Sequence, residues 1–305
     1  MPGSDFSLPL SVMLRDHLKL QVIVILWGFT AVLGELISLS AATLVAWRCG
    51  LAALCLFLWL GKRLLVPPRL AFLFFATGFV IGAHWITFFL SVKVAKVSIC
   101  MIGIATLSLW TAILEPLIMR HRHFRRIDLI FGTLIVGGVA IIYRSELDYS
   151  HGLLIAIFSA FLAAVFSIIN AFHVKHAVHT VIVFYEMVGA TLFAGLFVFV
   201  QKGHLPLPAD PFDWLWLTIL AVFCTVVSFS QYVKLLKRMS VFTINFVANL
   251  EPVYGIALAA LILQDYKNLN AGFFLGAAVI LVAIALYPVV RHKTTGKAAR
   301  RDPFP

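Results

Sequence analysis

The sequence consists of long apolar segments separated by short polar ones, and this pattern restricts the chain to very few kinds of structure. An apolar helix of about 20 residues is long enough to cross the hydrocarbon core of a membrane. The segments show no period-2 alternation, which argues against a β-barrel, and an open strand would leave its backbone unpaired in lipid. We therefore predict an all-α integral membrane protein with ten transmembrane helices, at residues 18–37, 41–60, 70–92, 97–119, 127–144, 152–173, 181–200, 213–233, 241–263 and 270–290.

Composition supports a lipid environment. Hydrophobic residues make up 62% of the chain and charged residues 12%, with a mean hydropathy of +1.02, whereas soluble domains have roughly 45–50% apolar and 25% charged residues. The net charge of +11 would suit nucleic acid, but the chain has neither a basic face nor an RNA-binding motif. We expect the lipid bilayer as a partner and no nucleic acid.

The basic residues between the predicted helices indicate an orientation. When the loops are assigned alternately to two sides, 18 Lys and Arg residues fall on one side and five on the other, and Arg48 lies within a helix. The positive-inside rule then places both termini in the cytoplasm, as an even number of spans requires. We predict a multi-pass protein of the cell (inner) membrane, with cytoplasmic segments at residues 1–17 and 291–305 and a first helix that is retained rather than cleaved as a signal peptide.

The two halves of the chain resemble each other. Glu115-Pro116 and Glu251-Pro252 are 136 residues apart, and a shift of 138 residues aligns AWRCGLAAL (46–54) with FYEMVGATL (184–192). The predicted repeats are 18–146 and 152–290, with five helices each. Because five is odd, the second repeat enters the membrane from the opposite face, which predicts an inverted-topology repeat with a substrate site between the halves.

Several segments carry a resemblance to a known family: Arg48 within WRCGLAAL, GAHWITFFLSVKVAKVS (82–98), ILEP (113–116) and NLEPVYGIALAALIL (249–263). With these segments, the chain resembles the drug/metabolite transporter superfamily, specifically its EamA-type branch, over about residues 18–288. The resemblance implies a secondary carrier of small metabolites, often an exporter, with a central cavity open to one side at a time. The chain departs from the pattern at Gln264-Asp265, where such proteins commonly have a glutamate.

Ionisable residues inside the predicted helices are costly and are candidates for function. Arg48 and Glu186 occupy equivalent positions in the two repeats, preceded by Trp47 and Tyr185. One interpretation is that they bracket a polar, zwitterionic substrate, with the guanidinium binding a carboxylate and the glutamate binding an amine. The alternative is an ion pair that locks two helices without touching substrate.

A histidine and a tryptophan lie together in the middle of the third predicted helix, as His84-Trp85 in GAHWITFF. The indole can stack on a cation or a ring, and the imidazole can form hydrogen bonds or carry a proton. The alternative is a histidine that bonds a neighbouring helix, next to a packed tryptophan. Trp27 has a similar character.

Two prolines interrupt apolar segments and are each preceded by a glutamate. Pro116 and Pro252 cannot donate a backbone hydrogen bond, so we expect them to act as hinges beside a polar notch. Glu251 is then a candidate for proton coupling, or else a group that only holds a neighbouring helix. Asn249 is predicted to lie in the cavity wall.

Other functions fit the sequence less well. A nucleotide-sugar or phosphate-ester exchanger of the same superfamily would need several basic cavity residues, and only Arg48 lies well inside a helix. His123 and Asp128 have an acyltransferase-like spacing but lie in a basic turn, and no other enzyme motif, P-loop or channel filter is visible. No cysteine or histidine spacing suits a metal. We predict a transporter of a small-molecule substrate that is not an enzyme and has no metal or cofactor.

Overall fold

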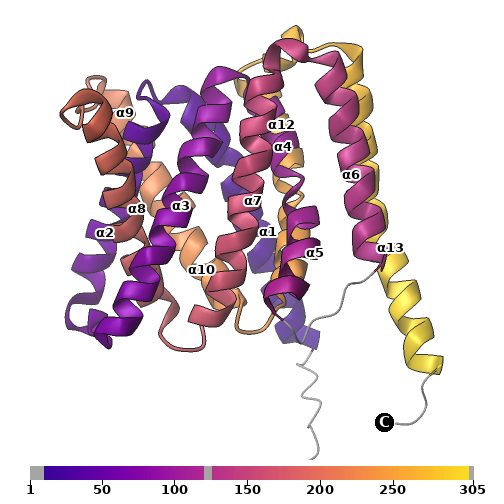
Figure 1. Ribbon diagram of the computed structural model, residues 1–305, viewed down its shortest axis with the longest axis horizontal. Helices are drawn as coiled ribbons and strands as arrows, with labels where there is room; N and C mark the ends of the chain where they lie inside the picture. The colour runs from indigo at the N-terminus through magenta and orange to yellow at the C-terminus, as the bar shows by residue number, and fades with distance from the viewer. Residues whose placement is uncertain (1–9, 120–125, 302–305) are drawn as a thin grey trace, which may run out of the picture.

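The computed structural model describes residues 10–119 and 126–301, and within these ranges it contains helices and no strand (Figure 1). Three short 3₁₀ segments, Gly61–Leu64, Leu147–Tyr149 and Asp265–Asn268, connect some of the helices. The α-helices are α1 (Leu10–Leu36), α2 (Ala41–Leu60), α3 (Pro68–Val94), α4 (Val97–Ile104), α5 (Leu107–Ile118), α6 (Arg126–Ser145), α7 (Ser150–His173), α8 (His179–Lys202), α9 (Pro211–Ala221), α10 (Ser228–Leu235), α11 (Val241–Ala248), α12 (Glu251–Ile262) and α13 (Ala271–Arg301).

Eight helical segments of the described chain are long and apolar enough to cross a membrane. They coincide with eight of the ten predicted spans. At the other two, the described chain has shorter apolar stretches, Leu129–Ser145 in α6 and Ala271–Tyr287 in α13. The all-helical membrane architecture is confirmed. Helix α1 begins and helix α13 ends at the same end of the bundle (Figure 1).

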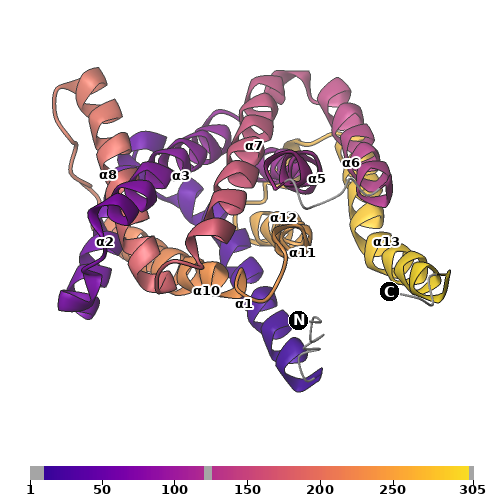
Figure 2. The same ribbon diagram turned by 60° about the horizontal axis from the view of Figure 1, so that its bottom comes forward.

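Close helix contacts depend on glycines that let two backbones touch. Helices α6 and α13 lie side by side at one edge of the molecule (Figures 1 and 2). A Cβ atom on Gly138 would come within 2.8 Å of the Gly276 carbonyl oxygen. Helices α3 and α8 meet in the same way, because a Cβ on Gly78 would collide with the backbone of Glu186, and one on Gly189 with the backbone of Phe75. Small residues allow this close approach in membrane bundles.

Two of the spans are interrupted. Between α4 and α5 the amides of Ala105 and Thr106 bond carbonyls three residues back, although Ala105 also bonds the Met101 carbonyl at 3.1 Å, and the Thr106 hydroxyl donates to the Gly103 carbonyl. Between α11 and α12 the amides of Asn249 and Leu250 do the same, directly before Pro252, which lacks an N–H. The second interruption therefore lies where a proline hinge was predicted.

The first interruption does not lie at the proline that the sequence singled out. Pro116 is inside α5, and the helix continues through it to Ile118. The break falls earlier, at Thr106, because a threonine hydroxyl that bonds the local backbone competes with regular helix formation.

Candidate functional site

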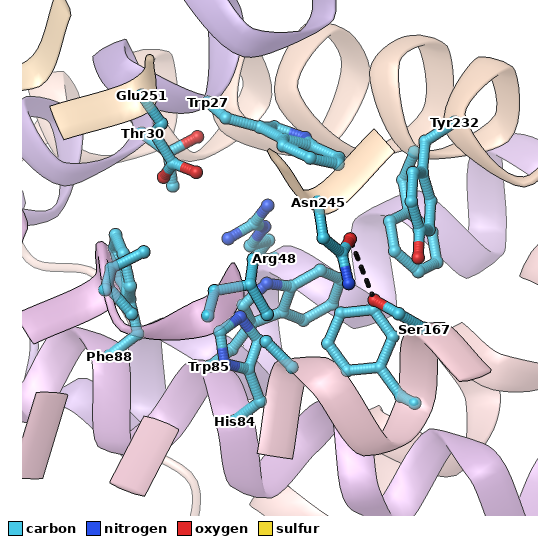
Figure 3. Close-up of a pocket in the computed structure, with 15 residues that line it drawn as sticks. Trp27, Thr30, Arg48, His84, Trp85, Phe88, Ser167, Tyr232, Asn245 and Glu251 are labelled. Carbon is cyan, nitrogen blue, oxygen red and sulfur yellow. Dashed lines mark hydrogen bonds between the residues drawn. The ribbon is translucent and has the colours of Figure 1, made fainter. Parts of the chain in front are cut away.

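A cavity lies between the two halves of the chain and is lined by eight of the helices and by α10, which continues a π-helical segment (Figure 3). Its walls come from both halves: Trp27, Thr30, Arg48, His84, Trp85, Phe88, Ile104 and Leu107 from the first, and Ala163, Phe166, Ser167, Phe229, Tyr232, Asn245 and Glu251 from the second. The centres of water molecules can occupy about 60 Å³ of it. One water needs roughly 10–15 Å³ by this measure, so the cavity has room for a few waters.

Both helix interruptions border this cavity. Ile104 and Leu107 flank the break between α4 and α5, and Glu251 follows the break between α11 and α12. Interrupted helices are the usual way in which transporters bring polar backbone and helix ends to a substrate site. Two helix breaks therefore face the same cavity, and together they place polar backbone groups beside it.

Arg48 is 1% exposed and is held by the opposite half of the chain. Its Nε donates to the Thr225 hydroxyl at 2.7 Å, and Nη2 donates to the Cys224 carbonyl at 3.3 Å. Its guanidinium carbon lies 4.1 Å from the centroid of the Trp85 ring, a cation–π contact. Nη1 has no hydrogen-bond partner among the described residues. The guanidinium is thus fixed on one edge and free on the other.

A short π-helix positions the Arg48 acceptors. Residues Val222–Val227 connect α9 to α10 with wider turns than an α-helix, and the Thr225 hydroxyl donates to the Leu220 carbonyl at 2.9 Å. The Cys224 carbonyl also accepts from the Ser228 hydroxyl, which in turn accepts from the Trp27 indole N–H at 3.1 Å. π-helical turns are rare and occur often at functional sites. Sequence analysis did not identify Thr225 or Ser228, because Ser and Thr are common within apolar helices.

Glu251 lies across the cavity from Arg48 (Figure 3). Its carboxylate is in the first turn of α12, where the helix dipole favours a negative charge. The described residues show no ion pair within 4.0 Å between the two groups. A guanidinium and a carboxyl group therefore face one small space without direct contact.

His84 is anchored to α7 and borders the cavity. Its Nδ1 lies 2.9 Å from the Ser159 carbonyl oxygen, and the Ser159 hydroxyl donates to the His84 carbonyl at 2.8 Å. Because a carbonyl only accepts, Nδ1 carries the hydrogen in this bond. Nε2 makes no hydrogen bond with the described residues, so it is the nitrogen that a solute would meet.

The remaining wall is mostly aromatic and includes the amide of Asn245. Trp27 packs edge-on against Tyr232 with ring centroids 5.3 Å apart, and Trp85 does so against Phe229 at 5.7 Å. Asn245 donates to the Thr111 hydroxyl at 2.9 Å, and its carbonyl oxygen faces Ser167 (Figure 3). Such walls suit a solute with a flat or apolar body and polar ends.

The structure brings together four of the predicted site residues, Arg48, His84, Trp85 and Glu251, in one cavity. It places three others elsewhere. The Tyr185 hydroxyl donates to the Leu64 carbonyl at 3.0 Å, and Asn249 is buried beside the break without lining the cavity. Glu186 is buried behind the wall, and the described residues show no Arg48–Glu186 ion pair. Hydrogen bonds to Thr225 and Cys224 hold the Arg48 guanidinium at the cavity that Glu251 also lines, and Glu186 does not line this cavity.

Comparisons with known proteins agree with this architecture. A solved structure described as "Crystal structure of protein" is similar with a TM-score of 0.67 and 13% identity, covering 92% of this chain and 98% of that one. It is one of 24 matching chains of solved structures. A search of curated proteins finds no match. The EamA-like transporter family matches residues 18–144 and 150–287, which together make up most of the chain. The chain therefore belongs to the EamA-like transporter family of membrane proteins.

Proposed function

We propose that this membrane transporter is a secondary active carrier that exports a small polar metabolite, an amino acid or a related compound, by alternating access. In this proposal ten helices span the cell (inner) membrane in two inverted repeats, 18–146 and 152–290, with both termini in the cytoplasm. The segments 1–17 and 291–305 are then the cytoplasmic ends.

The observation that carries the proposal is that a guanidinium and a carboxyl group from opposite halves face one cavity. Arg48, from the first half, has a free Nη1, and Glu251, from the second half, presents a carboxylate. A zwitterion satisfies both groups at once: its carboxylate binds the guanidinium, and its amine binds Glu251. This supports substrate binding as the role of Glu251, rather than proton coupling alone.

The two helix breaks support alternating access. Each break lies beside the cavity and has few regular backbone hydrogen bonds, so small changes in φ and ψ there can reorient α5 and α12. Element ends that absorb such changes are the usual hinges of closing domains. We assign the moving points to Ala105–Thr106 and to Asn249–Leu250 next to Pro252.

Counterflow into proteoliposomes tests the proposal. The purified protein is screened with amino acids, cationic drugs, sugars and phosphate esters, each loaded inside and added as tracer outside. We expect tracer exchange with a zwitterion, lost in Arg48→Met and in Glu251→Gln. Matched controls are Arg144→Met and Glu35→Gln, which remove the same charges at exposed positions.

Two outcomes would contradict this assignment. Exchange of phosphate esters or nucleotide sugars alone would favour the other exchanger class, which the cavity's single Arg or Lys among the described residues does not support. Full exchange in both cavity variants would remove Arg48 and Glu251 from substrate binding. Chemical conversion of the tracer would indicate an enzyme.

A further inference from the structure

A second buried polar cluster lies behind the cavity wall and is not explained by substrate binding. It consists of Glu186 on α8, Asn170 on α7 and Tyr232 on α10. Glu186 and Asn170 are 0% exposed, and Tyr232 is 1% exposed. Asn170 lies beside the Glu186 carboxyl, and the Tyr232 hydroxyl is close enough to sense its charge.

The polar atoms of this cluster are unsatisfied. Both carboxylate oxygens of Glu186, both amide atoms of Asn170 and the Tyr232 hydroxyl lack a hydrogen-bond partner among the described residues. Buried polar groups are nearly always bonded, and an exception calls for an explanation, such as a bound ion or proton. A buried carboxylate that is neither paired nor hydrogen-bonded is costly.

In the described part of the chain, no basic side chain forms an ion pair with Glu186. Helix α3 meets it through the backbone at Gly78, and the cationic Arg48 of α2 is bound to Thr225. On α7 the nearest titratable group is His173, whose ring nitrogen bonds the Thr77 hydroxyl at 2.8 Å. The group that faces Glu186 from α10 is Tyr232. The neighbouring 3₁₀ segment exposes its basic residues, Lys62 and Arg63, and the charged or titratable ends of α8 are His179 and Lys202.

We propose that Glu186, Asn170 and Tyr232 form a binding site for one monovalent cation, either a proton or Na⁺, that drives transport through the neighbouring cavity. The site offers oxygen atoms and a single negative charge. Such a set matches a cation of charge one, whereas Ca²⁺ takes six to eight oxygens and several carboxylates. The proposal rests on the carrier function proposed above and separates the cation site from the substrate site.

Tyr232 connects the two sites. Its side chain lines the cavity on the side opposite Glu251 (Figure 3), and its hydroxyl lies beside Ser167 and within electrostatic reach of Glu186. The ring also contacts Trp27 and Phe229, which are part of the cavity wall. A cation that draws the Tyr232 hydroxyl toward Glu186 therefore alters the wall that the substrate meets. By linkage, substrate binding changes the affinity for the cation by the same factor.

A substrate-free measurement tests the cation site. Thermal unfolding of the full-length purified protein is followed at high and low pH, each in NaCl or in choline chloride. Because a ligand that binds only the folded state raises its stability, the unfolding midpoint of the wild type should rise with Na⁺, or with falling pH if the cation is a proton. Glu186→Gln should lose that dependence, and Glu35→Gln, which changes an exposed carboxylate, should keep it.

The direction of the stability change in Glu186→Gln distinguishes a cation site from a glutamate that only stabilises the fold. Removing an uncompensated buried charge should make Glu186→Gln more stable than the wild type at high pH without Na⁺. Tyr232→Phe, which keeps the ring and removes the hydroxyl, should show a weakened cation response. A Glu186→Gln protein that is less stable than the wild type under those conditions, or that keeps the full cation response, would overturn the proposal.

Transport measurements distinguish this proposal from the carrier function itself. Counterflow needs no driving ion, so Glu186→Gln should retain exchange of the tracer but lose accumulation driven by a Na⁺ or pH gradient. Absence of any exchange by the wild type would refute the carrier function and leave the cation response intact. Undiminished gradient-driven accumulation by Glu186→Gln would refute the cation site alone.

Discussion

The orientation of Arg48 should depend on one hydroxyl group of the π-helix. Thr225→Val keeps the shape of the side chain but removes the acceptor for Arg48 Nε, which now lies 2.7 Å away. It also removes the bond from Thr225 to the Leu220 carbonyl. Thr225→Ser keeps the hydroxyl and loses only a methyl group, so it serves as the matched control.

The size of the effect follows from the contacts. A hydrogen bond to a charged group contributes about 1.5–3 kcal/mol, and each 1.4 kcal/mol is about a factor of ten in affinity. After the substitution the guanidinium keeps only the 3.3 Å bond to the Cys224 carbonyl. If the whole loss falls on substrate binding, the half-saturation concentration in counterflow should rise about 10- to 100-fold in Thr225→Val, and much less in Thr225→Ser.

The comparison between the two variants decides the interpretation. The amount of folded protein is first matched by size-exclusion chromatography, so that the kinetics report the site. Equal half-saturation in Thr225→Val and the wild type would show that the π-helix does not orient Arg48 for binding. An equally large loss in Thr225→Ser would attribute the effect to packing and not to the hydroxyl.

Three further predictions concern the scaffold. Gly189→Ala should lower the thermal unfolding midpoint markedly because its Cβ would collide with α3, whereas Gly195→Ala on the same helix, which meets nothing within 4 Å, should not; equal midpoints would contradict the close contact. Asp213→Ala should cost about 1–3 kcal/mol of unfolding free energy in denaturant titration, because this buried carboxylate accepts two bonds from the loop between α1 and α2; an unchanged titration would show that the loop is held otherwise. Arg238→Met should cost about 1–3 kcal/mol in the same assay, because it leaves the buried Asp16 carboxylate without its 3.1 Å ion-pair partner, and an unchanged titration would mean that solvent replaces the arginine.

The sequence does not specify which charged groups face each other, as Arg48 and Glu186 show. The alignment of the halves paired Arg48 with Glu186, but symmetry between repeats does not specify which way each helix faces. In the structure Arg48 turns toward Thr225 and Cys224 and faces Glu251, while Glu186 is buried with Asn170. Helix rotation is set by packing over the whole bundle, and no local pattern records it.

The sequence indicates some of the helix interruptions and not others. A helix interruption lies just before Pro252, whose missing N–H disrupts the backbone at a position that is visible in the sequence. Helix α5 continues through Pro116, and the break in that span lies at Thr106, whose hydroxyl bonds the Gly103 carbonyl. The π-helix at Val222–Val227 has no proline or glycine to announce it.

The sequence by itself determined the membrane environment, the positions of eight of the ten predicted spans and the family. These follow from local properties, because lipid requires apolar helices of about 20 residues that satisfy their own backbones. Only the tertiary structure decided which polar groups share a cavity. The hydrogen bond between Arg48 and Thr225 joins residues 177 positions apart. Such contacts form only when packing of the whole bundle has fixed the rotation and spacing of each helix.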